Sequence, residues 1–140
     1  MQHAGFDTAA DALDFILGGR AIVTLTSART GVHYTYKVSK KDDGPYFVGV
    51  LSGPDNGADY TYLGFIPADA PDYLVAGRKG HPEAPSFKAF DWTLQRLRRG
   101  VLPEALTIQH EGRCCRCNRV LTHPDSIRSG IGPECAKKGA

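Results

Sequence analysis

The four cysteines of the chain gather near its C-terminal end with the spacing of a metal site. Cys114 and Cys117 form a Cys-x2-Cys pair, and 17 residues separate Cys117 from Cys135. A two-residue spacer lets a tight turn aim two thiolates at one ion, and structural zinc takes four ligands in a tetrahedron. The first 113 residues contain no cysteine, which argues against a disulfide framework spread over the chain. We therefore expect Zn2+ bound by Cys114, Cys117 and Cys135, and the alternative is a small thiol cluster without metal.

The fourth zinc ligand has three candidates in the sequence. His110 lies four residues before Cys114, at the end of a predicted strand that enters the turn, and we favour it. His123 lies in a loop, and Cys115 sits between the paired cysteines, where its side chain would point away from the shared ion. Four protein ligands would make the site structural, whereas a water in the fourth position would leave it open for catalysis.

Charge is distributed unevenly along the chain. Residues 1–85 hold seven basic and ten acidic side chains, whereas residues 86–140 hold ten basic and five acidic ones. A basic segment with an aromatic side chain suits phosphates and a stacked base. The alternative is a solvated helix face with Trp92 packed under the preceding connector. The candidate nucleic-acid-binding residues are Lys88, Trp92, Arg96, Arg99, Arg113, Arg116, Arg119 and Arg128.

Tyrosines recur at alternate positions in two predicted strands, as Tyr34 with Tyr36 and Tyr60 with Tyr62. Aromatics displayed on a sheet would form a platform for single-stranded nucleic acid, but packing in the core or across strands is the favoured interpretation. No nucleophile elbow, phosphate-binding loop, HExxH motif or dinucleotide fingerprint is present. We therefore predict no catalytic residues.

The hydrophobic pattern of the sequence predicts the helices and strands that would carry these residues. A helix is predicted over 7–17, with Asp7 or Thr8 as its N-cap. Thr8 with Asp11 three residues on resembles a capping box, and Leu13, Ile16 and Leu17 fall on one face. Alternating β-branched and aromatic runs separated by turn residues then predict an antiparallel meander of about four strands. These runs cover residues 21–27, 32–38, 46–51 and 60–66.

A proline-rich connector over residues 67–85 precedes a second predicted helix. Ser86 is its predicted cap, and it ends at Arg99 before Gly100. Its apolar stripe consists of Phe87, Phe90, Leu94 and Leu97. A short strand over 105–109 leads into the cysteines. We predict an α+β fold in which a small antiparallel sheet of about four strands packs with two helices, with an α+β domain over 1–104 and a zinc-binding tail over 105–140.

The C-terminal segment resembles a zinc-ribbon-like tail of uncharacterised proteins from bacteriophages, plasmids and their hosts. The resemblance rests on the Cys-x2-Cys pair, the Leu121-Thr122-His123-Pro124-Asp125-Ser126 segment and the Gly130-Ile131-Gly132-Pro133-Glu134-Cys135 turn. Upstream, the residues from Leu51 to Asn56 and from Asp59 to Gly64 are similar as well. The resemblance implies zinc bound by three cysteines, with His110 at the matching upstream position. It implies no established activity, and this chain has Cys115 where those proteins usually have glycine.

These observations favour a non-enzymatic zinc-binding accessory protein of phage or mobile-element type that binds DNA or RNA through its basic C-terminal surface. The alternative is an interaction module that inhibits a host defence complex, such as an anti-CRISPR-like inhibitor. The least supported interpretation is a metal-assisted hydrolase, which needs an open coordination position on the zinc ion. No apolar stretch approaches the roughly 20 residues needed to span a bilayer, and residues 1–19 lack a basic start followed by an apolar core. We therefore expect a protein of the bacterial cytoplasm with no membrane partner.

Overall fold

The structure of the chain is a computed structural model. The described residues are 4–6, 8–40, 43–53, 59–69, 73–77, 82–104 and 106–110. The arginines from Arg113 to Arg128, the four cysteines and His123 lie outside them. The predictions made for those residues therefore stay predictions.

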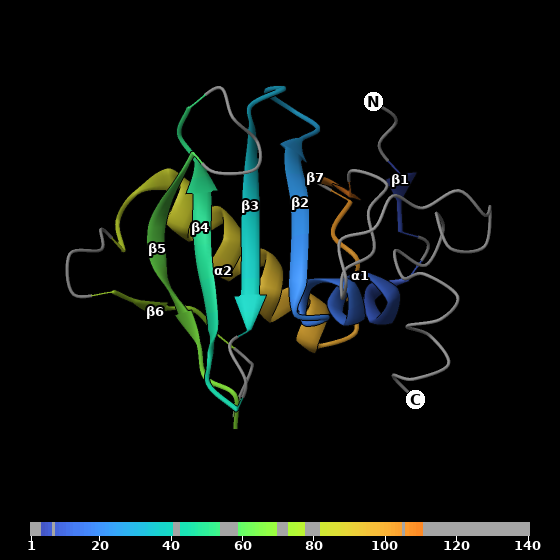
Figure 1. Cartoon of the computed structure of the whole chain (residues 1–140). Coiled ribbons are helices and arrows are strands. Elements are labelled where there is room, and N and C mark those ends of the chain that lie inside the picture. The colour runs from blue at the N-terminus through green and yellow to red at the C-terminus, as the bar shows by residue number, and fades with distance from the viewer. Residues whose placement is uncertain are drawn as a thin grey trace.

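In the described part of the chain, seven strands form one antiparallel sheet in the order β1-β7-β2-β3-β4-β5-β6 (Figure 1). Strands β2 to β5 are neighbours in chain order, so the predicted four-stranded meander is confirmed. The strands are β1 (Ala4–Gly5), β2 (Arg20–Ser27), β3 (His33–Lys40), β4 (Tyr46–Leu51), β5 (Tyr60–Ile66), β6 (Val75–Ala76) and β7 (Leu106–His110).

Three strands extend the sheet beyond the predicted four, so the predicted strand number was too small. β1 and β6 contain two residues each, too few for an alternating pattern to be visible in the sequence. β6 pairs with β5 and lies within the predicted connector. A Cβ atom on Gly64 would collide with the carbonyl oxygen of Val75, so this pairing requires glycine at position 64.

β7 confirms the predicted short strand but has an unexpected place in the sheet. It pairs with β1 on one side and with β2 on the other. The sheet therefore includes residues 106–110, which the sequence assigned to the zinc-binding segment. The C-terminal segment starts from a strand that is hydrogen-bonded on both sides.

The N-cap of helix α1 (Ala9–Ile16) is Thr8, one of the two predicted candidates, and its Oγ1 accepts the backbone N–H of Asp11 at 3.1 Å. The buried face of the helix differs from the predicted one. Phe15 and Ile16 are buried together with two alanines of the helix, whereas Leu13 and Leu17 are only partly covered. The alanines allow the helix backbone to lie close to its neighbours, which apolar periodicity alone does not reveal.

Helix α2 (Pro85–Arg98) buries the predicted stripe of Phe87, Phe90, Leu94 and Leu97. The predicted cap at Ser86 is wrong, because the N-cap is Ala84 and makes no side-chain hydrogen bond. Pro85 occupies the first helical position, where its missing N–H costs nothing and its fixed φ suits the helix.

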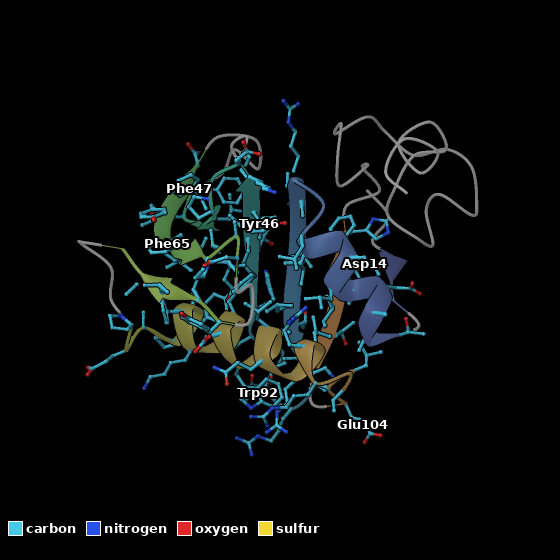
Figure 2. All side chains as sticks on the ribbon, turned by 90° about the horizontal axis from the view of Figure 1, so that it is seen from below. Asp14, Tyr46, Phe47, Phe65, Trp92 and Glu104 are labelled. Carbon is cyan, nitrogen blue, oxygen red and sulfur yellow. The ribbon has the colours of Figure 1, made fainter. Side chains whose placement is uncertain are left out.

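Both helices lie on one side of the sheet and contact each other (Figure 2). The core lies between them and the inward-facing side chains of the strands. Tyr36 on β3 joins the two layers, because its hydroxyl donates to the backbone carbonyl of Ser86 at 2.7 Å. Its ring centroid lies 5.0 Å from that of Phe90.

Candidate nucleic-acid interface

The face of α2 opposite its apolar stripe carries the predicted basic residues, with Arg99 as the C-cap residue. Lys88 and Arg99 are exposed and Arg96 is half-buried. Trp92 is 39% exposed. Figure 2 shows Trp92 on the side of α2 away from the sheet, among nitrogen-tipped side chains. The structure therefore brings the described members of the predicted set onto one helix and its end.

Arg96 lies over the indole of Trp92, with its guanidinium carbon 4.9 Å from the ring centroid. The two residues are one helical turn apart, the spacing at which side chains on one face meet. In this position the guanidinium interacts with the face of the ring, and its N–H groups can still donate to acceptors such as phosphate oxygens. The pair is thus a stacking surface with a positive charge beside it.

The positive charge of this face is not neutralised within the described residues, where no carboxylate pairs with Lys88 or Arg96. Asp91 is the single acidic residue in the α2 sequence. Its carboxylate accepts the backbone N–H of Leu74 at 3.0 Å and the side-chain N–H of Gln95 at 3.1 Å. Asp91 therefore ties the residue before β6 to α2.

A groove of about 570 Å³ runs between α2, the turn joining β2 to β3, and β7. It includes two of the exposed large apolar side chains of the described residues, Trp92 and Val32. The lining residues are Leu25, Thr26, Ser27, Thr30, Val32, Tyr34, Lys88, Ala89, Trp92 and Leu106. The groove therefore has mainly apolar walls, with a cation and hydroxyl groups among them.

The four tyrosines do not form one ladder. Tyr36 pairs with Val50 and Val50 pairs with Thr61, so Tyr60 and Tyr62, which flank Thr61, lie on the other face of the sheet. Tyr36 is fully buried against α2. The favoured packing interpretation is thus confirmed for Tyr36.

The outer face of the sheet carries its own aromatic pair. Tyr62 and Phe47 are 48% and 39% exposed, and their ring centroids are 6.1 Å apart. Lys37 lies 5.8 Å from the ring centroid of Tyr60 on the same face. This face thus holds exposed aromatics, although its cations are fewer than those of α2.

His110 is the one predicted zinc ligand among the described residues. Its side chain is fully buried at the end of β7. The imidazole centroid lies 5.1 Å from the ring of Phe15 and 5.4 Å from the ring of Phe6. Among the described residues, no three His, Cys, Asp or Glu side chains come together as a metal site. The structure therefore leaves the predicted ligand set untested.

A match to a protein family was found for the C-terminal quarter of the chain. Residues 104–138 match DUF6011, a family of unknown function. The DUF6011 match includes β7 with His110, and also all four cysteines. No curated protein and no solved structure matches the chain. Neither of the described helices is long and apolar enough to cross a membrane.

Sequence reasoning found the cationic and aromatic residues of α2 but missed the groove beside them. The sequence does not distinguish the groove residues Thr26, Thr30 and Val32 from ordinary strand and turn residues. They reach the groove because β2 and β3 present their shared turn to α2. A pairing of elements about 60 residues apart in the chain has no local sequence signal.

Proposed function

We propose that this chain is a non-enzymatic zinc-binding accessory protein that binds nucleic acid through the basic face of α2. The observation that carries the proposal is the Arg96–Trp92 stack, which is flanked by Lys88 and Arg99 and has no carboxylate partner among the described residues. Phosphate binding by such cations supplies nearly all of the non-specific affinity of nucleic-acid-binding proteins.

The arginines of the C-terminal segment would extend this surface. Arg113, Arg116, Arg119 and Arg128 follow His110, the last residue of β7, whereas Leu106 at the start of β7 lines the groove next to Trp92. The phage and plasmid resemblance of this segment fits an accessory protein of a mobile element that acts in the bacterial cytoplasm.

Zinc would organise that C-terminal segment through Cys114, Cys117, Cys135 and His110. Three thiolates and one imidazole are a ligand set typical of structural zinc. About 30 residues cannot bury a sufficient core, so metal binding would supply much of the folding free energy of the segment. Because His110 lies in a strand paired on both sides, it would anchor the zinc site to the sheet.

Nucleic-acid binding is tested by fluorescence anisotropy with labelled oligonucleotides over a series of salt concentrations. The double variant Lys88→Ala, Arg99→Ala should bind more weakly and lower the slope of log K against log salt by about 1.4, at about 0.7 for each phosphate contact on single strands. The matched control is Arg20→Ala, Lys40→Ala, which removes two exposed cations at the other end of the β2–β3 hairpin. Equal slopes for the two double variants would contradict the interface.

No binding of any oligonucleotide at low salt would contradict the proposed function itself. A stoichiometric protein complex that survives nuclease treatment would then favour the defence-inhibitor alternative, for which the exposed Trp92 would be a natural contact residue.

The zinc site is tested by measuring metal content on purified protein. Wild-type and Cys115→Ser protein should each carry one zinc, whereas Cys117→Ser should lose it. Loss of zinc from Cys115→Ser would contradict the His110 ligand set, because it would place Cys115 on the ion.

A further inference from the structure

We infer that the groove beside Trp92 binds one unpaired nucleobase, so that this protein prefers single-stranded to double-stranded nucleic acid. The inference rests on the proposed function and names the form of nucleic acid that the same site takes. It starts from the juxtaposition of the Arg96–Trp92 pair with an apolar groove of about 570 Å³, a volume within the usual range of small-molecule pockets.

The groove suits a flat apolar ligand more than a phosphate. Its walls include the aromatic side chains of Trp92 and Tyr34 and the aliphatic side chains of Leu25, Val32 and Leu106. Bases that are stacked inside a duplex cannot enter such a groove, whereas unpaired bases stack readily on aromatic side chains.

Hydroxyl groups of the β2–β3 turn could contact the edge of a base in the groove. Ser27 Oγ accepts the backbone N–H of Thr30 at 3.3 Å, and Thr30 Oγ1 accepts the backbone N–H of Val32 at 3.3 Å. Each hydroxyl thus uses a lone pair inside the turn and keeps its own O–H to donate. Gly31, at φ +76°, allows the tight turn that holds both hydroxyls there.

Charge complementarity identifies the rest of the ligand. Lys88 lines the groove, and Arg96 lies over the face of Trp92. A base in the groove is covalently joined to phosphates on both sides, and these are the anions that Lys88 and Arg96 would contact. An apolar peptide would fill the groove but would leave these cations without partners.

Trp92 is the single tryptophan of the chain, so its fluorescence reports directly on the groove. Four ligands of equal length are titrated at equal salt: single-stranded DNA, single-stranded RNA, duplex DNA, and a DNA strand with abasic sites in place of its bases. Single strands with bases should quench Trp92 and bind more tightly than the duplex and the abasic strand.

Variants locate the effect in the groove, with binding measured by anisotropy. Trp92→Ala should weaken single-strand binding roughly 5- to 150-fold, the usual effect of losing one stacking side chain, and Trp92→Phe should retain most of it. Ala89→Leu should fill the groove and abolish the preference for single strands while leaving the salt dependence intact. The matched control is Phe47→Ala, which removes an equally exposed aromatic from the outer face of the sheet.

The outcomes separate this inference from the proposed function. Equal binding of abasic and base-containing strands, with no effect of Trp92→Ala, would overturn the base site while leaving nucleic-acid binding intact. A loss with Phe47→Ala as large as that with Trp92→Ala would also overturn it, because the bases would then contact the outer sheet face. No binding of any of the four ligands would overturn the proposed function.

Discussion

The Tyr36–Ser86 hydrogen bond provides a test of how α2 is held on the sheet. Tyr36 is fully buried on β3, and its hydroxyl donates to the carbonyl of Ser86 in the first turn of α2 at 2.7 Å. Tyr36→Phe removes the hydroxyl and little volume. At pH 7 it should therefore lower the free energy of unfolding by about 1 kcal/mol, the net value of one such bond.

The size of this effect should depend on pH. Burial raises the pKa of Tyr36 well above its ordinary value, and the neighbouring Tyr34 raises it further. A raised pKa in the folded state stabilises the protein fully below the unfolded pKa of about 10, and the stabilisation is lost as pH rises towards the folded pKa. At pH 10.5 the wild type should have lost about 1 kcal/mol through this tyrosine, whereas Tyr36→Phe loses nothing there.

The difference in stability between wild type and Tyr36→Phe should therefore shrink from about 1 kcal/mol at pH 7 to near zero at pH 10.5. Urea denaturation followed by far-ultraviolet circular dichroism at both pH values measures it. Tyr62→Phe is the control, because Tyr62 is 48% exposed. Loss of its hydroxyl should change the free energy of unfolding by less than about 0.5 kcal/mol. A difference for Tyr36→Phe that stays constant or grows with pH would refute the reasoning.

Four further substitutions test the contacts that hold the fold around the interface. Thr8→Ala removes the cap of α1 and should cost about 1 kcal/mol in urea denaturation, with faster amide exchange in the first turn. Leu94→Ala truncates a buried side chain of α2 and should cost about 2–5 kcal/mol by the same assay. Thr24→Val and Thr35→Val each break a hydroxyl pair at 2.8 Å and should each cost about 1 kcal/mol, whereas the double variant should cost less than their sum.

Local sequence patterns predicted most of the elements that carry the candidate interface. The apolar stripe of α2 recurs at three and four residues, so it also showed which side chains must lie on the opposite face. Trp92 and Arg96 could be placed together from their four-residue separation alone, and the structure stacks them. Such predictions succeed because helical periodicity and turn residues act over a few neighbouring positions.

Local sequence patterns could not predict where α2 starts or on which face of the sheet each tyrosine lies. Ser86 is a good capping residue, but Pro85 before it suits the first helical position, so the helix starts earlier. Tyr36 and Tyr62 belong to similar alternating strands, and their faces depend on the register between strands. A shift of one residue in that register would move each tyrosine to the opposite face, and the sequence of one strand alone does not specify its register with the next strand.

By itself, the sequence determined the two helices, the four-stranded meander, the basic α2 face and a cysteine pattern suited to zinc. Only the tertiary structure decided that β7 lies between β1 and β2, that His110 is buried against Phe15, and that a groove opens beside Trp92. The physical reason is the range of the interactions. Helix periodicity, caps and ligand spacing depend on residues that are near neighbours in the sequence. Strand order and a groove between layers depend on contacts between segments far apart in the chain, and the sequence of one segment does not show which other segment it will contact.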